Sequence, residues 1–143
     1  MASAMSFVLS AGFVASAAWF VVGSILYMNP LVAAQYRKET DSPGFRTWTN
    51  TGRYLLLTYL FTLVQTLLWA GVFWFIRGAL PATAAARIVA FAVILIATKI
   101  IPRFLDMWIQ STYPLRLLVI ELINGSIGSV VVAAVYTLML RSS

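Results

Sequence analysis

The chain contains neither cysteine nor histidine among its 143 residues. Disulfide bonds, thiol redox chemistry, zinc or haem ligation through these side chains and catalysis by a nucleophile–imidazole pair are therefore excluded. Acidic residues are also scarce, because Asp and Glu together number 4. We therefore expect no metal site and no cofactor, and we do not expect an enzyme, since neither a nucleophile–base pair nor a metal-ligand set is visible.

Charge of either sign is rare as well. Charged residues make up 10% of the chain, against about 25% in a soluble domain. Hydrophobic residues make up 62%, and the mean hydropathy is +0.91. Most of the chain therefore has lipid as its solvent, and we expect a multi-pass protein of a cell membrane, of the bacterial inner-membrane type.

Long apolar runs predict an all-α membrane fold. A spanning helix needs about 20 residues. Runs of this length cover approximately residues 5–28, 54–76, 84–108 and 115–140, and a polar loop at the membrane interface covers residues 29–53. The sequence therefore predicts a bundle of four transmembrane helices in a single membrane domain, residues 1–143.

The distribution of basic residues predicts the orientation. With the N-terminus outside, seven Lys and Arg residues belong to the cytoplasmic side and three to the outside. The positive-inside rule then favours an N-out, C-out protein. Because the basic residues follow membrane topology, the net charge of +6 does not indicate a nucleic-acid partner.

The polar loop carries basic and aromatic residues suited to an anionic membrane surface. Aromatic rings lie at headgroup depth, while Arg and Lys meet phosphates. The lipid-headgroup candidates are Arg37, Lys38, Arg46, Trp48 and Arg53. They form either a general anchor or a specific lipid site. Ser42 followed by Pro43 also predicts a short interfacial helix over residues 43–49, while Asn29 followed by Pro30 favours a turn or a new helix start.

Small residues recur on one face of the first and fourth predicted helices. In lipid, such a stripe lets neighbouring helix backbones approach closely. We expect a packing seam there, which would also allow a homo-oligomer. Its members are Gly12, Ser16, Gly23, Gly125 and Gly128.

Polar side chains share one face of the second predicted helix, with Gln65 at the middle of the span. An amide that faced lipid would lack hydrogen-bond partners, so this face turns towards protein or water. Two interpretations stay open, namely hydrogen bonding between helices and the wall of a polar cavity.

The third predicted helix holds Lys99, Arg103 and Asp106 in one row, with Pro102 among them, and the fourth holds Glu121. A lone charge at mid-bilayer costs about 2.5 to 3.5 kcal/mol, so we expect these side chains to face the bundle. In a structural role they form a neutral network, with Arg103 paired to Glu121 and to Asp106 and with Lys99 bending towards either acid.

The same row allows a functional role, in which Pro102 kinks the helix and opens a vestibule. The candidates for binding an ion or an anionic solute are Lys99, Arg103, Asp106, Glu121, Asn124 and Gln65. The protein is then transporter-like or channel-like. The alternative is a non-catalytic scaffold, a partner subunit or a lipid-binding protein. A cavity that touches Lys99 and Glu121 would favour the first, and a closed ion pair the second.

Two segments suggest a family. The stretch from Gly23 to Leu31, with Tyr27 and Pro30, is similar to the small–aromatic–Tyr-x-x-Pro-Leu signature of the membrane family called domain of unknown function 1761. The hairpin over residues 102–137 also looks like that family's last two helices. The resemblance implies four helices in a small bacterial-type membrane protein, and it carries over no activity and no catalytic residues.

Overall fold

The structure is a computed structural model that describes residues 3–44 and 46–141, with the side chain of Arg141 left out. Within these ranges the chain forms helices and no strand. In chain order they are α1 (Ala4–Met28), α2 (Pro30–Lys38), α3 (Thr51–Ile76), α4 (Ala84–Leu95), the π-helical turn η1 (Ile96–Ile100), α5 (Ile101–Gln110) and α6 (Leu115–Arg141).

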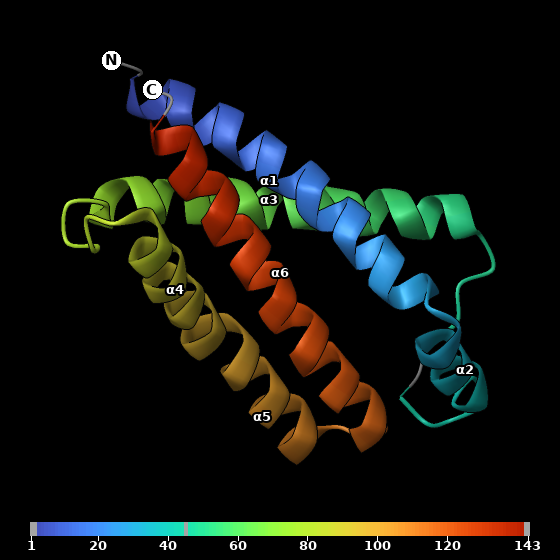
Figure 1. Cartoon of the computed structure of the whole chain (residues 1–143). Coiled ribbons are helices and arrows are strands. Elements are labelled where there is room, and N and C mark those ends of the chain that lie inside the picture. The colour runs from blue at the N-terminus through green and yellow to red at the C-terminus, as the bar shows by residue number, and fades with distance from the viewer. Residues whose placement is uncertain (1–2, 45, 142–143) are drawn as a thin grey trace.

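Among the described residues, four helical segments are long and apolar enough to cross a membrane, which confirms the predicted all-α fold. They are α1, α3, the continuous segment Ala84–Gln110 made of α4, η1 and α5, and α6. The start of α1, the α3–α4 connection and the end of α6 lie at one end of the molecule, which we call the terminal end (Figure 1). The other end holds α2 and the α5–α6 turn, and we call it the α2 end. The N-out, C-out orientation stays a prediction.

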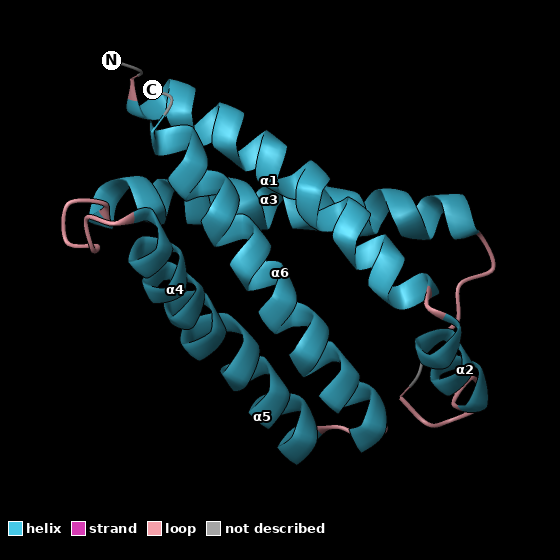
Figure 2. Ribbon diagram, viewed as in Figure 1, coloured by secondary structure: helices cyan, strands magenta, loops and turns pink. Residues whose placement is uncertain are grey.

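Helix α1 lies between α3 and α6, and α4 packs on the other side of α6 (Figure 2). Small residues bring these helices close. A Cβ atom added at Gly12 would lie 2.6 Å from Leu67 on α3, and one added at Gly128 would lie 2.6 Å from the Trp19 ring on α1. A Cβ at Gly125 would lie 2.8 Å from Ile100.

The small-residue stripes thus pack against other helices of the same chain. Ser16 and Gly23 are buried like Gly12 and Gly128. A homo-oligomer would need other surfaces or a displacement of these contacts, and it stays a prediction.

An aromatic core closes the terminal end. Phe7, Phe73, Phe91 and Tyr136 come from α1, α3, α4 and α6, and each is at most 1% exposed. The Phe73 ring centroid lies 4.9 Å from that of Phe91 and 5.5 Å from that of Tyr136. The Tyr136 hydroxyl donates to the carbonyl of Thr66 on α3. All four spans therefore meet in one tightly packed cluster.

A short helix does form in the polar loop, but at α2 and not over residues 43–49, where the described residues form a turn, irregular backbone and a bend. The Asn29 side chain caps α2 by accepting from the Leu31 amide at 2.9 Å, and Pro30 takes the first helical position. At the other site Gly44 has φ +83°, a left-handed conformation that stops a right-handed helix. The prediction of a helix over residues 43–49 is therefore wrong.

Pro102 changes the third span without breaking it. The residues before it form η1, in which the Ile101 amide donates to the Ile96 carbonyl across a wide turn. Proline has no N–H to donate and its ring crowds the preceding turn, so a wider turn accommodates it. The helix therefore continues to Gln110 with its regular α-helical spacing interrupted at Lys99.

Candidate functional site

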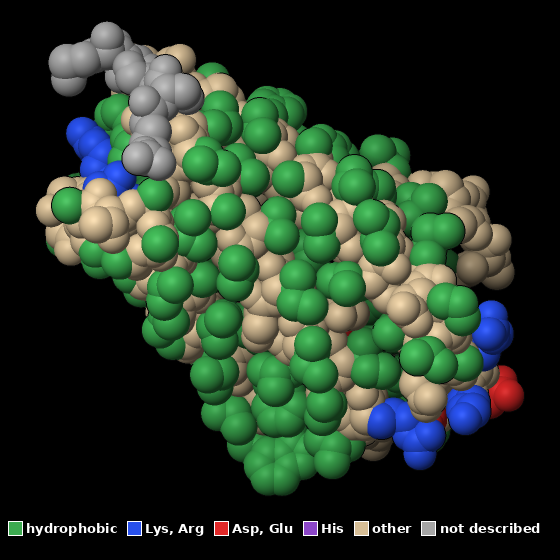
Figure 3. Space-filling view, in the orientation of Figure 1, with side chains coloured by type: hydrophobic (Ala, Val, Ile, Leu, Met, Phe, Trp, Pro, Cys, Tyr) green, Lys and Arg blue, Asp and Glu red, His purple; other side chains and the backbone are tan. Residues whose placement is uncertain are grey.

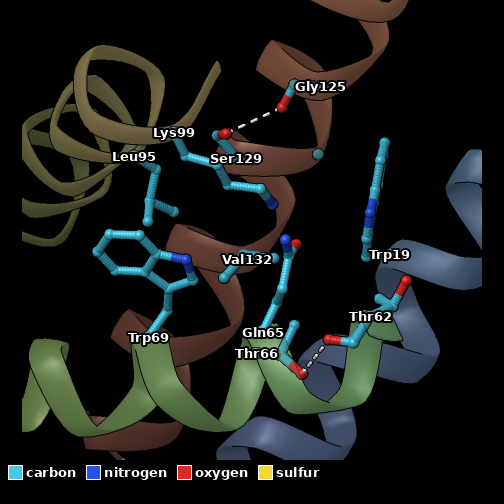
Figure 4. Close-up of a pocket in the computed structure, with 11 residues that line it drawn as sticks. Trp19, Thr62, Gln65, Thr66, Trp69, Leu95, Lys99, Gly125, Ser129 and Val132 are labelled. Carbon is cyan, nitrogen blue, oxygen red and sulfur yellow. Dashed lines mark hydrogen bonds between the residues drawn. The ribbon is translucent and has the colours of Figure 1, made fainter. Parts of the chain in front are cut away.

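A polar cavity lies inside the bundle, where α1, α3, η1 and α6 come together (Figure 4). Its volume is about 20 Å³, and a polar site of about 10 to 15 Å³ holds one water molecule. The lining residues that carry nitrogen or oxygen in the side chain are Trp19, Thr62, Gln65, Thr66, Trp69, Lys99 and Ser129. The cavity is thus large enough for one water molecule or for a ligand of similar size.

Lys99 enters this cavity from η1 and extends towards the carboxamide of Gln65 on α3 (Figure 4). It lies eleven residues before the end of its span at Gln110, or about 16 Å along the helix axis. The side chain is half-buried and forms no ion pair with any described residue. The expected approach of Lys99 to Asp106 or Glu121 is therefore not observed.

The cavity wall offers nitrogen donors. No hydrogen bond within the described residues engages the side-chain nitrogens of Lys99, Gln65, Trp19 or Trp69. The hydroxyl groups that line the cavity, in contrast, already donate hydrogen bonds within their own helices. Thr66 and Ser129 donate to carbonyls of their own helices at 3.0 and 2.9 Å.

No carboxylate lines the described wall of this cavity. One cation and several free N–H groups around a space of this size suit an anion or a water molecule better than a cation. The polar face of α3 is therefore a cavity wall at Gln65, one of the two interpretations that its sequence left open.

A second polar group lies nearer the α2 end, around Glu121. Arg103 Nη2 lies 3.1 Å from Glu121 Oε2, and the Tyr113 hydroxyl donates to Glu121 Oε1 at 2.7 Å. The Arg103 side chain is 58% exposed and that of Glu121 only 21%. Both carboxylate oxygens are thus engaged, and the ion pair joins α5 to α6.

Tyrosines from three parts of the chain surround this carboxylate. Tyr27 is at the end of α1, Tyr36 is on α2, and Tyr113 is in the α5–α6 turn. The Tyr27 and Tyr36 ring centroids are 5.8 Å apart, edge to face. The charges of Glu121 and Arg103 both act on the Tyr27 hydroxyl.

Burial raises the pKa of both tyrosines that lie outside the spanning helices. For Tyr36 the neighbouring Tyr27 and then Glu121 add to the effect. For Tyr113 the hydrogen bond to Glu121 adds to it. Both hydroxyls therefore keep their protons at neutral pH, and Tyr113 acts as a donor to the carboxylate.

Sequence reasoning missed these tyrosines. Tyr27 and Tyr113 lie near the ends of apolar segments and Tyr36 lies in the polar loop. Both positions are also typical of tyrosines that anchor a protein at the membrane surface.

Asn124 lies one turn beyond Glu121 on α6 and is 5% exposed. Its Nδ2 atom has no hydrogen-bond acceptor within the described part of the chain. Because Gly125, the next residue, lines the Lys99 cavity, Asn124 stands between the two polar groups.

Asp106 does not join either group. It is exposed and accepts a hydrogen bond of 2.6 Å from Gln110 Nε2, four residues further along α5. The predicted neutral network of four charges is therefore wrong. Arg103 pairs with Glu121 as expected, but η1 interrupts the row that would have aligned Lys99 with the other charges.

The structure thus divides the expected site in two. The cavity touches Lys99 and Gln65 but not Glu121, while Glu121 forms an ion pair with Arg103. The expected cavity that touches both Lys99 and Glu121 is therefore not observed, and the Arg103–Glu121 ion pair forms apart from the cavity that Lys99 lines.

The predicted lipid-headgroup candidates belong to α2, to the loop after it and to the start of α3. Figure 3 shows Lys and Arg side chains gathered at the α2 end of a largely apolar face. Arg37 and Lys38 form the last turn of α2 and Arg53 lies in the first turn of α3. The Arg46 guanidinium carbon lies 4.4 Å from the Trp48 ring centroid. These four basic residues are exposed.

No protein-family model, no curated protein and no solved structure matches the chain. The resemblance to the family called domain of unknown function 1761 stays a prediction.

Proposed function

We propose that this multi-pass membrane protein binds a small anion at Lys99 and passes it across the membrane as a transporter or a channel. One observation carries the proposal. A lysine near the middle of a spanning helix faces a polar cavity in which no described residue supplies a carboxylate. We place the protein in a cell membrane of the bacterial inner-membrane type, with both termini outside.

The energetic argument concerns the missing counter-charge. A charged side chain at mid-bilayer costs about 2.5 to 3.5 kcal/mol on insertion scales, and proteins offset this cost by internal pairing. The carboxylate of Glu121 is engaged by Arg103 and Tyr113. An anion in the cavity would therefore supply the charge that the protein does not.

The size and donors of the cavity limit the anion. A volume of about 20 Å³ favours a monatomic ion such as chloride, or another anion of very few atoms. The N–H groups of Gln65, Trp19 and Trp69 would replace part of the hydration shell that the ion loses. Exposed basic residues at the α2 end would raise the local concentration of anions.

The test is chloride flux into vesicles that contain the purified protein. Lys99→Met removes the ammonium and keeps most of the side-chain volume, and we expect it to lower the flux at least tenfold. Arg87→Met is the matched control, since it removes one positive charge from the same span, outside the cavity. We expect its flux to stay within twofold of wild type.

The proposal fails if Lys99→Met, folded by circular dichroism, conducts chloride as the wild type does. It also fails if Arg87→Met loses as much flux, because the loss would then follow net charge and not the cavity.

A second candidate function rests on the Glu121 group. Its contacts tie α5 to α6 and reach Tyr113 in the connecting turn, as expected of a scaffold, a partner subunit or a lipid-binding protein. Unchanged flux in Lys99→Met together with lower stability in Glu121→Gln would favour this candidate.

A further inference from the structure

We propose that a groove between α2 and the start of α6 binds one membrane phospholipid, with its phosphate at Arg116. The groove has a volume of about 730 Å³. Its walls include Gln35 of α2, Glu39 directly after α2, and Leu115, Arg116, Val119 and Ile120 of α6. It contains none of the five lipid-headgroup candidates predicted from the sequence, and it is separate from the Lys99 cavity.

The groove is polar at one end and apolar at the other. Its charged residues, Glu39 and Arg116, lie where α2 ends and α6 begins, which is also where the fourth spanning segment starts. Val119 lies one turn further into that segment, about 6 Å along the axis from Leu115. A phospholipid has the same order, with a headgroup at the interface and acyl chains below it.

Arg116 forms an ion pair at the polar end, and its side chain is 58% exposed. Its Nε atom lies 3.4 Å from Glu39 Oε1, and the other oxygen of Glu39 accepts from Ser42. The two terminal nitrogens of the Arg116 guanidinium have no acceptor among the residues that the structure covers. A guanidinium presents such paired N–H groups to two oxygens of a phosphate.

The apolar end points to a lipid with acyl chains. Leu115 is 53% exposed and Val119 is 41% exposed, and they lie beside the cation on a spanning helix whose surroundings are hydrocarbon. A free phosphate would use Arg116 alone, and a lipid without phosphate would use the apolar wall alone. Only a phospholipid matches both ends of the groove.

The experiment compares four additives on the delipidated protein in detergent, by thermal unfolding and by native mass spectrometry. They are phosphatidylglycerol, phosphatidylethanolamine, diacylglycerol and glycerol phosphate. We expect both phospholipids to raise the unfolding temperature and one phospholipid to remain bound. Diacylglycerol lacks the phosphate and glycerol phosphate lacks the chains, so neither should act. An equal effect of either one overturns the proposal.

Two variants test the groove itself. Arg116→Gln should weaken phospholipid binding about tenfold, and Arg87→Gln, at the terminal end, should leave it unchanged. Because Arg116→Gln also removes the ion pair with Glu39, Val119→Trp provides a second test, in which the groove is filled and the ion pair is kept. It should abolish the bound lipid.

A further variant distinguishes binding of the phospholipid in the groove from a general attraction of lipid headgroups to exposed basic residues. Arg37→Gln changes an exposed residue of α2 outside the groove walls. If it weakens binding as much as Arg116→Gln does, or if Val119→Trp binds lipid as the wild type does, the proposed site is wrong.

Discussion

The two ends of the bundle are held together by different forces. At the terminal end, four aromatic rings from four helices pack with at most 1% of each residue exposed. At the α2 end, the contacts of Arg103, Glu121 and Tyr113 are ionic or hydrogen-bonded and partly open to the surroundings. In lipid, helices associate by close packing and by hydrogen bonds, not by leaving water. The terminal end relies mainly on close packing, with one hydrogen bond from Tyr136 to Thr66, and the α2 end relies on the ion pair and the hydrogen bond of Glu121.

We expect the terminal end to contribute most of the stability and the polar half of the bundle to carry the function. A dense aromatic cluster can keep the four spans together while the other half of the bundle holds polar groups that oppose close packing. The Lys99 cavity lies between the two ends, beside the π-helical turn. We therefore expect mutations at the terminal end to affect folding most, and mutations near Lys99 to affect the anion.

The largest expected effect tests the terminal end. Phe73→Ala should lower the free energy of unfolding by about 3 kcal/mol, because it leaves a void among Phe7, Phe91 and Tyr136. Phe75→Ala removes the same atoms from the same helix at a position that is 88% exposed, and it should change little. Unfolding in mixed detergent, followed by circular dichroism, measures both. Equal losses in the two variants would contradict a stabilising aromatic core.

A smaller effect is expected at the α2 end. Glu121→Gln removes the ion pair with Arg103 and weakens the hydrogen bond from Tyr113. Because Arg103 is largely exposed, the expected loss is only about 1 kcal/mol. Asp106→Asn is the matched change at an acid outside this group and should be close to neutral. A loss in Asp106→Asn as large as that in Glu121→Gln would mean that Asp106 belongs to the group after all.

The smallest effect concerns the Tyr113 hydroxyl. Tyr113→Phe should cost about 0.6 kcal/mol, a typical value for a hydrogen bond in a membrane protein. The raised pKa of Tyr113 means that the folded state holds this proton more tightly than the unfolded state. The stabilisation is therefore complete below about pH 10 and is lost as pH rises through the raised pKa.

Thermal unfolding at pH 7, 9 and 11 measures this dependence. The difference in stability between wild type and Tyr113→Phe should be equal at pH 7 and pH 9 and smaller at pH 11. A difference that grows with pH would contradict the assignment of Tyr113 as a proton donor to Glu121.

The sequence alone determined the four spans and several of the site residues. The length and apolarity of a run are local properties, so they are visible without any knowledge of neighbouring helices. The same holds for the rarity of an ionisable side chain in such a run, which singled out Lys99 and Glu121. The pairing of Arg103 with Glu121 was also predictable, because the helix lengths place the two at a similar depth.

Only the tertiary structure decided which polar groups meet. The separation of Lys99 from the acids depends on η1, and its approach to Gln65 depends on how α3 crosses the other helices (Figure 1). The tyrosines around Glu121 come together because α2 folds back over the start of α6, where Glu39 pairs with Arg116. Such contacts join segments that are far apart in the chain. The local sequence pattern of one segment does not predict which other segment it will contact.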